Sequence, residues 1–391
     1  MHSMLIVLAD DFSGATEIAG IGHRYGLNTE IQFTIDSNSR ADLLVVDTGT
    51  RAMPEPDAIR KISDVSAGLS QIPHIRLFKK IDSVMRGHLV PELDALQPHF
   101  HFKRILVLPA NPVRGRKIID GVYRVNDVPL NETVFAADPD FPCTTASVTS
   151  RIRSFTSALQ HVHVDPSHLP ALGLITGDVA STGDLRNYVT ATNENDLCCG
   201  GAELFECFLE HLGHSPTVLP NHQPHSEFVL IMNGSTVRNQ SEKELFDRFE
   251  VPQFSVPDFS HDTLTWDALK IQHSFGQIAE ALASRKVAVV SVAHPVHPDK
   301  AVSELFLNYF GELIRYMTTR MQKKDIHFCL TGGATAIRVI KNSDAGQLHI
   351  HTEVASGVVT LATDKKMFFT VKPGSYPWPQ PWLEKIVRTG K

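Results

Sequence analysis

Two adjacent aspartates stand directly after a short apolar segment near the start of the chain. Asp10 and Asp11 follow residues 4–9, MLIVLA, and precede a Phe-Ser-Gly sequence. The apolar segment has the length and β-branched content of a buried strand, and a helix is expected over Thr16–Tyr25. In open α/β sheets, ligands bind beyond the carboxyl ends of the strands. The two carboxylates therefore predict a ligand-binding site at the end of the first strand.

A basic segment follows another predicted strand. Residues 78–87 read FKKIDSVMRG and supply four polar side chains of interest: Lys80, Asp82, Ser83 and Arg86. Arginine offers a planar fork that suits a carboxylate, and lysine offers a point charge. Together with the two aspartates, this segment predicts a site for a small polyhydroxy acid, in which the cations bind the acid group and the carboxylates bind the hydroxyls. A solvated, charged turn is the alternative interpretation.

A third polar segment, PANPVRGRK at residues 109–117, also follows a predicted strand. It brings Arg114 and Arg116 to the same kind of position, so that three strand ends with polar side chains could converge on one cleft. The segment also fits a proline-containing loop that leads into a hairpin around Asn126-Asp127. The loop does not exclude a site at the two arginines.

The elements that must position these side chains alternate between two kinds. Short apolar segments predict strands at 5–8, 43–46, 75–78, 105–108 and 172–176 in the first half and at 228–232, 287–292, 326–330 and 367–371 in the second. Longer amphipathic segments predict helices between them, for example at 56–71, 89–98 and 299–322. This alternation is typical of an α/β fold with largely parallel sheets flanked by helices.

A stretch rich in turn residues divides the chain. Residues 213–224, GHSPTVLPNHQP, lack periodicity, and the alternation of strands and helices restarts after them. A length of 391 residues also favours two domains over one. We predict an N-terminal domain at 1–213, a linker at 214–226 and a C-terminal domain at 227–391.

Glycine-rich turns follow three of the strands predicted in the second half. They read NGST at 233–236, TGGATA at 331–336 and KPGS at 372–375. Glycine lets a ligand approach the backbone closely, and a helix N-terminus presents unpaired N–H groups to anions. The turns therefore predict a phosphate or nucleotide site, although similar turns also serve steric needs in α/β folds. Neither GxxxxGK[ST] nor GxGxxG is present, so an ordinary Walker or Rossmann site is not supported.

Composition limits the classes of function. The formal net charge of -6 argues against nucleic-acid binding through bulk charge, and no apolar segment approaches the roughly 20 residues that span a membrane. The five cysteines have no CxxC spacing, which argues against a disulfide framework and a structural zinc site. The N-terminus lacks the features of a signal peptide, so we expect a cytoplasmic protein. The histidine pairs have no third metal ligand at a recognised spacing, and no GxSxG motif marks a serine hydrolase.

The motifs together resemble the four-carbon acid sugar kinase family, whose members phosphorylate threonate, erythronate or 3-oxo-tetronate. The similarity extends over nearly the whole chain. In chain order, the matching segments are ADDFSGA at 9–15, KIDSVMRG at 80–87, PANP at 109–112 with Gly115-Arg116, Asp120-Gly121 and PLNET at 129–133, Gly234-Ser235 with Asn239-Gln240, GGATA at 332–336, and KPGS at 372–375. Each match is moderate, and their common order makes the set specific.

The resemblance implies an N-terminal domain that binds the acid sugar, a C-terminal domain that binds ATP with Mg²⁺ as its co-ion, and phosphoryl transfer in the cleft between them. It places the acid sugar at Asp10, Asp11, Lys80, Asp82, Ser83 and Arg86, to which we add Arg116. It places ATP at Ser235, Gly332, Gly333, Ala334, Thr335 and Gly374, to which we add Lys372. Phosphoryl transfer also needs a group that orients the attacking hydroxyl, and we assign this role to Asp10 or Asp11. No metal ligand is assigned.

Two segments depart from the pattern of the family. After the final turn this chain has Tyr376-Pro377-Trp378, where an aromatic residue and a glycine are usual. Ala334 stands in the glycine turn, where an acidic residue is usual. We expect an ATP-dependent kinase of a small sugar acid, with two alternatives. The chain could be a binding protein that keeps the acid-sugar site but has lost transfer, or a protein that keeps the fold and binds an unrelated ligand. The sequence leaves open which acid is bound, and it leaves a homodimer as one alternative for the oligomeric state.

Overall fold

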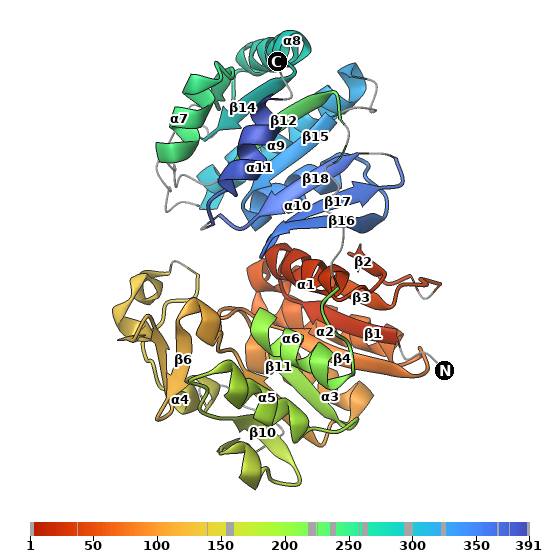
Figure 1. The fold of residues 1–391 in the computed structure, drawn as a ribbon, viewed down its shortest axis with the longest axis vertical. Helices are drawn as coiled ribbons and strands as arrows, with labels where there is room; N and C mark the ends of the chain where they lie inside the picture. The colour runs from red at the N-terminus through yellow and green to blue at the C-terminus, as the bar shows by residue number, and fades with distance from the viewer. Residues whose placement is uncertain are drawn as a thin grey trace. The chain divides into compact units, whose positions relative to one another are not determined.

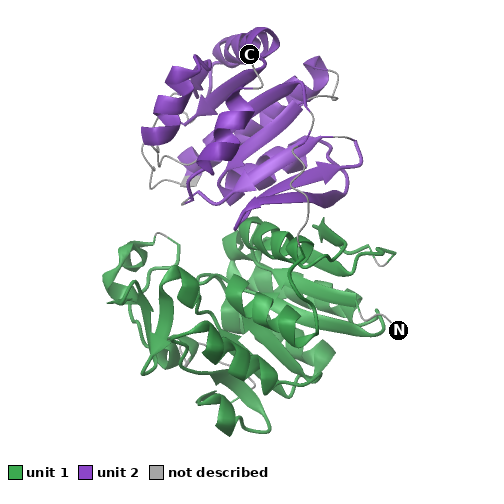
Figure 2. Cartoon of the chain, in the orientation of Figure 1, with its two compact units in different colours: residues 1–219 green, residues 220–391 purple. Residues whose placement is uncertain are grey.

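The first apolar segment forms β1 (Met4–Ala9), which lies inside a parallel sheet. β1 pairs with β3 (Leu43–Asp47) on one side and with β4 (Ile75–Lys80) on the other. The computed structural model describes residues 4–36, 38–138, 140–153, 160–217, 224, 226–234, 240–257, 259, 265–292, 300–321, 326–365, 367–374 and 376–388. The chain forms two compact units, Met1–Leu219 and Pro220–Lys391 (Figure 2). The predicted α/β class is confirmed.

The sheet of the first unit is parallel throughout its described strands. Its order is β2 (Thr29–Gln32), β3, β1, β4, β11 (Asp196–Gly200), β5 (Arg104–Leu108), β10 (Gly173–Thr176) and β9 (His161–His163) (Figure 1). Strands β1, β3, β10 and β11 are almost wholly buried, which explains the apolar sequences of β1 and β3. β2, β9 and β11 are absent from the sequence prediction. β11 reads DLCCG, which lacks the β-branched residues that mark the other strands.

Helices connect these strands. They are α1 (Phe12–Arg24), α2 (Glu55–Leu69), α3 (Leu89–Phe100), α4 (Val148–Arg153), α5 (Thr182–Thr190) and α6 (Ala202–His211). Helices α1, α6 and α5 pack side by side, as do α2 and α3 (Figure 1). The structure begins α1 at Phe12, ahead of the predicted start, because the Asp11 carboxylate caps the helix.

A small antiparallel sheet is inserted after β5. It consists of β6 (Arg116–Ile119), β7 (Val122–Val125) and β8 (Val128–Pro129). Asn126 and Asp127 connect β7 to β8 with φ of +50° and +65°. Two positive φ angles are typical of the tight turns that join hairpin strands. The predicted hairpin is therefore confirmed.

The sheet of the second unit is mixed. Its order is β13 (Gln253–Ser255), β14 (Val287–Ser291), β12 (Phe228–Asn233), β15 (Ile326–Thr331), β18 (Phe368–Lys372), β17 (Val358–Thr363) and β16 (Leu348–Ala355). The neighbouring strands β13, β14, β12, β15 and β18 pair in parallel. At one side of the sheet, β17 pairs antiparallel with both β18 and β16. The helices are α7 (Gln240–Arg248), α8 (Ala268–Arg285), α9 (Lys300–Arg320), α10 (Gly333–Asn342) and α11 (Gln380–Arg388).

The core of the second unit joins its sheet to two of these helices. Val229 of β12 and Val289 of β14 belong to a buried cluster with Leu245 of α7 and Leu383 of α11. Of the predicted linker at 214–226, residues 218–223 and 225 lie outside the described residues. Among the helices that the structure describes, none has the length and hydropathy to cross a membrane.

Candidate functional site

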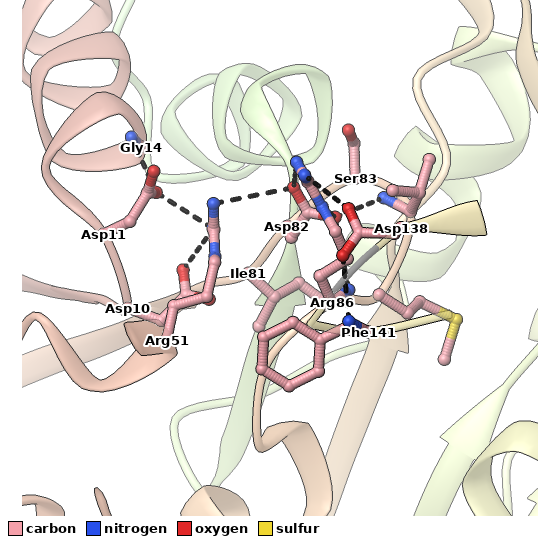
Figure 3. Close-up of polar contacts among 12 residues, drawn as sticks. Asp10, Asp11, Gly14, Arg51, Ile81, Asp82, Ser83, Arg86, Asp138 and Phe141 are labelled. Carbon is pink, nitrogen blue, oxygen red and sulfur yellow. Dashed lines mark hydrogen bonds and ion pairs between the residues drawn. The ribbon is translucent and has the colours of Figure 1, made fainter. Parts of the chain in front are cut away.

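The register of the first sheet aligns the ends of its central strands. Ala9, the last residue of β1, pairs with Asp47 of β3 and with Lys80 of β4. The residues that follow these strands therefore meet at one edge of the sheet, where α/β proteins place their ligands. Figure 3 shows the resulting cluster, which combines Asp10 and Asp11 with Arg51 and Asp82.

Asp10 is held by a bidentate ion pair with Arg51. Arg51 Nε donates to Asp10 Oδ2 and Nη2 donates to Oδ1, both at 2.8 Å. The Asp10 side chain is 5% exposed. Burial by itself raises the pKa of Asp10, but the charges of Arg51, Lys79 and Lys80 outweigh that effect and lower it. Asp10 is therefore a fixed anion.

Asp11 occupies a more open position beside it. Its Oδ1 accepts the backbone N–H of Gly14 at 3.0 Å and lies 2.9 Å from Arg51 Nη2. The side chain is 25% exposed. Desolvation by the surrounding protein and the neighbouring Asp10 charge raise the pKa of Asp11 against the opposing charges of Arg51 and Lys80. Two adjacent carboxylates thus have pKa values shifted in opposite directions.

The turn after β4 is organised by Asp82. Its carboxylate accepts from Arg86 Nε at 3.1 Å and from Arg86 Nη2 at 2.9 Å, and Oδ2 also accepts the backbone N–H of Val84. Arg86 Nη1 reaches Asp138 Oδ2 at 3.3 Å (Figure 3). Burial opposes the charged form of Asp82, but Arg51 and Arg86 hold the pKa of its carboxyl well below its usual range. Arg86 therefore stabilises the turn by binding the carboxylates of both Asp82 and Asp138.

The structure brings together Ser83 and Arg116, two of the site residues named from the sequence. Arg116 Nη1 donates to Ser83 Oγ, and the Tyr123 hydroxyl donates to the Ser83 carbonyl oxygen. The second contact joins the small antiparallel sheet to the turn after β4. Arg116 is thereby placed beside the cluster.

The two lysines of β4 are both buried. Lys80 Nζ donates to the Ile81 carbonyl oxygen at 3.0 Å and lies 3.6 Å from Glu17. A Cβ atom at Gly14 would lie 3.2 Å from Lys80 Nζ, so the first turn of α1 packs tightly against this lysine. Lys79 Nζ lies 2.8 Å from Glu92 of α3, in a fully buried ion pair. Alternate strand residues point to opposite faces, which explains why adjacent lysines have different partners.

In the second unit, a similar register aligns three strand ends. Thr331 of β15 pairs with Asn233 of β12 and with Lys372 of β18. The Thr331 hydroxyl donates to Asn233 Oδ1 at 2.8 Å. The glycine turns that follow these strands therefore begin at one edge of the sheet.

The N-terminus of α10 provides backbone N–H groups at this edge. Gly332 is the N-cap with φ of +94° and, as a glycine, has no side chain with which to cap the helix. Gly332 and Gly333 are half-buried, Ala334 is exposed and Thr335 is buried. The first N–H groups of a helix have no partner within it, and the helix dipole favours an anion there.

Gly234 and Lys372 shape the same region. A Cβ atom at Gly234 would lie 1.7 Å from Thr335 Oγ1, so the close approach of the two turns requires glycine. Lys372 is buried, and its Nζ donates to the Tyr376 carbonyl oxygen at 2.6 Å. Burial lowers the pKa of Lys372 to about 8. Gly374 follows in the adjacent turn, whereas Ser235 lies outside the described residues.

Sequence reasoning missed Arg51, which contacts three carboxylates of the cluster. A signal was present, because Arg51 follows the predicted strand 43–46 in the polar sequence DTGTR. It also missed Asp138, which lies far along the chain from its partner Arg86. No pattern in the sequence connects these two residues.

Comparison with known proteins places the first unit in a family. Residues 5–205 match the family model described as "Sugar-binding N-terminal domain". The chain belongs to this family. The predicted family resemblance is thus confirmed. The residues of the candidate cluster in the first unit all lie within the matched range, 5–205.

Relatives with curated names extend this finding. The D-threonate kinase of Salmonella typhimurium is 32% identical over an alignment of 201 positions that covers 49% of this chain and 47% of that protein. The 3-oxo-tetronate kinase of Haemophilus influenzae is 24% identical over 409 residues, covering 95% of this chain and 97% of that protein. A Haemophilus influenzae protein of known crystal structure has a TM-score of 0.75 at 20% identity, over 98% of this chain and 99% of that one. That structural likeness shows that this member of the sugar-binding family shares its fold.

Proposed function

We propose that the chain is an ATP-dependent kinase that phosphorylates a hydroxyl group of a four-carbon sugar acid such as threonate, erythronate or 3-oxo-tetronate. The observation that supports this most directly is similarity to a 3-oxo-tetronate kinase over 95% of the chain. The cluster of acidic and basic side chains in the sugar-binding region supplies matching chemistry.

In this proposal, Arg116 binds the carboxylate of the acid. The nitrogens of Arg51 and Arg86 are directed at protein carboxylates, whereas the contact between Arg116 and Ser83 uses only Nη1. The remaining N–H groups of Arg116 can form the paired bonds that a carboxylate prefers. Ser83 offers a hydroxyl to the sugar, and Lys80 adds positive charge behind Asp11.

Asp11 is the group that we propose to accept the proton of the attacking hydroxyl. Its raised pKa makes it a better base than Asp10, whose two oxygens are both bound by Arg51. As the bond between the sugar oxygen and the γ-phosphorus forms, the bond from that phosphorus to the bridging oxygen breaks. ADP leaves with the electron pair, and the hydroxyl proton passes to Asp11.

The second unit is proposed to bind ATP. The N–H groups of Gly333, Ala334 and Thr335 would face the phosphates at the start of α10, close to the turn of Gly374. Among the described residues, no group of three or more His, Cys, Asp or Glu could hold a metal by itself. Mg²⁺ usually keeps several waters and binds substrate phosphates with few protein ligands, so the phosphates of ATP would supply its main contacts. When bound, the ion neutralises charge on the phosphates.

The test is an assay that couples ADP release to a colour change. The purified chain is incubated with ATP, Mg²⁺ and each of D-threonate, D-erythronate and 3-oxo-tetronate, and binding of each acid is measured by calorimetry. ADP release with one acid supports the kinase. Acid binding without ADP release would favour the binding protein, and neither signal would favour an unrelated ligand. We further propose that the reaction takes place in the cytoplasm, and light scattering tests whether the chain forms a homodimer.

A further inference from the structure

The segment that carries Arg51 is joined to the end of β1 by its backbone. Arg51 N donates to the Asp10 carbonyl oxygen at 3.1 Å, and Thr48 N donates to the Ala9 carbonyl oxygen at 2.9 Å. The hydroxyl of Thr48 also donates to the Ala9 carbonyl oxygen at 2.8 Å. These contacts fix the backbone position of Arg51 independently of its side chain.

The guanidinium of Arg51 connects three carboxylates. It binds both oxygens of Asp10, lies 2.9 Å from Asp11 Oδ1 and lies 3.7 Å from Asp82 Oδ1 (Figure 3). Gly87 closes the cluster from another direction, because a Cβ atom there would lie 3.1 Å from Asp10 Oδ2 and 3.6 Å from Arg51 Cγ. The cluster is thus tightly packed, and the Arg51 side chain is 18% exposed.

Within the described residues, the two contacts of the Asp11 carboxylate both use Oδ1. We propose that Arg51 is a positioning residue: by holding Asp10 and Asp11 Oδ1, it presents Asp11 Oδ2 to the hydroxyl that attacks the phosphate. This inference rests on the proposed kinase function and adds a role that no family motif assigned.

The surrounding charges support the same role. Asp11 is influenced by Arg51, Lys80 and Asp10, and Asp10 is also influenced by Lys79. A nearby cation favours the ionised form of a carboxyl group. Removal of the Arg51 charge would therefore raise the pKa of both aspartates, and a larger fraction of Asp11 would be protonated and unable to accept a proton.

The experiment compares Arg51→Gln and Arg51→Lys with the wild-type chain. Arg186→Gln is the matched control, because Arg186 forms an exposed ion pair with Glu210 on α6. Two readouts are used: kcat as a function of pH, and the titration of the Asp10 and Asp11 carboxyl carbons by ¹³C NMR, assigned with the Asp→Asn variants. The NMR readout does not depend on turnover.

We expect Arg51→Gln to lower kcat at pH 7 by about 100-fold, because small errors in the position of a reacting group carry this cost. The acidic limb of its pH profile should move upward by about one pH unit, in step with the NMR titration of Asp11. Arg51→Lys keeps the charge, so the acidic limb of its pH profile should stay near that of wild type. Because lysine cannot bridge the carboxylates, its kcat should still fall by about 10-fold.

Three results would overturn the proposal. They are wild-type kcat in Arg51→Lys, an unchanged Asp11 titration in Arg51→Gln, or a fall in kcat of Arg51→Gln that is equal at every pH. If Arg51→Gln does not fold, the kcat of Arg51→Lys decides the question. If wild type phosphorylates none of the acids, the proposed function fails, and the NMR titration still shows whether Arg51 controls Asp11.

Discussion

Asp10 and Asp11 are adjacent in sequence but have different surroundings. Asp10 is almost completely buried, and both of its carboxylate oxygens are bound by Arg51. Asp11 is partly exposed and caps α1. When the surroundings shift the pKa values of two acids apart, the two can take separate roles. We therefore propose Asp11 rather than Asp10 as the proton acceptor, a choice that the sequence leaves open.

Replacement of Asp11 by asparagine should lower kcat by about 10²–10⁴-fold, because asparagine cannot accept the hydroxyl proton. Asparagine caps helices as well as aspartate does, so stability should change little. Steady-state kinetics and thermal unfolding measure these effects. Asp267→Asn is the control, because Asp267 caps α8 in the same manner but lies outside the cluster. Near-normal kcat in Asp11→Asn would remove the proposed role.

Replacement of Arg116 by lysine tests the proposed contact with the acid group. Lysine keeps the charge but loses the paired donors, so the KM for the sugar acid should rise by about 10-fold or more while the KM for ATP stays unchanged. Arg124→Lys is the control, because Arg124 lies on the neighbouring strand β7 and donates to the Asp127 carbonyl oxygen. An unchanged KM for every acid would show that another cation binds the carboxylate.

At the scale of elements, parallel strands bring together segments that are distant in sequence. In the first unit, β1, β3 and β4 end in register, and their following turns supply the aspartates and Arg51. In the second unit, β12, β15 and β18 end in register, and their turns supply glycines. Side chains form one candidate site, and backbone N–H groups form the other.

The close approach of two such turns leads to a prediction for Gly234. Gly234→Ala should raise the KM for ATP, because the new Cβ would collide with Thr335 at the start of α10. Gly276→Ala is the matched control, since Gly276 lies within α8 and a Cβ atom there meets nothing within 4 Å. It should leave kinetics unchanged and stabilise the helix by up to about 1 kcal/mol. An unchanged KM for ATP in Gly234→Ala would separate this turn from the nucleotide site.

At the scale of the whole molecule, each unit has its own sheet and its own candidate site. The first unit carries a group of carboxylates with lowered pKa values, including Asp82. A carboxyl group with a lowered pKa in the folded state stabilises the fold above its unfolded pKa, and the contribution is lost as the pH falls. The stability of this unit should therefore decrease in acid.

Asp82→Asn should unfold at a lower temperature than wild type at pH 7, by a margin equivalent to about 3 kcal/mol, because two arginines lose a charged partner. The difference should shrink below about pH 4, where the unfolded carboxyl group becomes protonated. Calorimetric scans between pH 7 and pH 3 measure this effect. Asp64→Asn, at an exposed position of α2, is the control. A difference that is constant with pH would mean that the Asp82 charge contributes nothing to stability.

Much of the fold could be predicted from local sequence. The predicted helix at 299–322 corresponds to α9, and the apolar segments correspond to β1, β3, β4 and β5. Periodicity identifies such elements because burial requires it. The pairing of β17 with β16 could not be predicted, because it depends on contacts between strands rather than on their own periodicity.

The sequence by itself determined which strand ends carry polar residues, because strand burial and turn chemistry are local properties. It therefore led to Asp10, Asp11 and the turn at 80–87. Only the tertiary structure decided which of these charged groups form ion pairs with one another. Arg51 reaches the aspartates through the pairing of β3 with β1. Burial raises the pKa of both carboxyl groups, and the charges around them then leave the pKa of Asp10 lowered and that of Asp11 raised. Electrostatic interaction depends on distance and solvent exposure, and the chain acquires both only when the strands assemble.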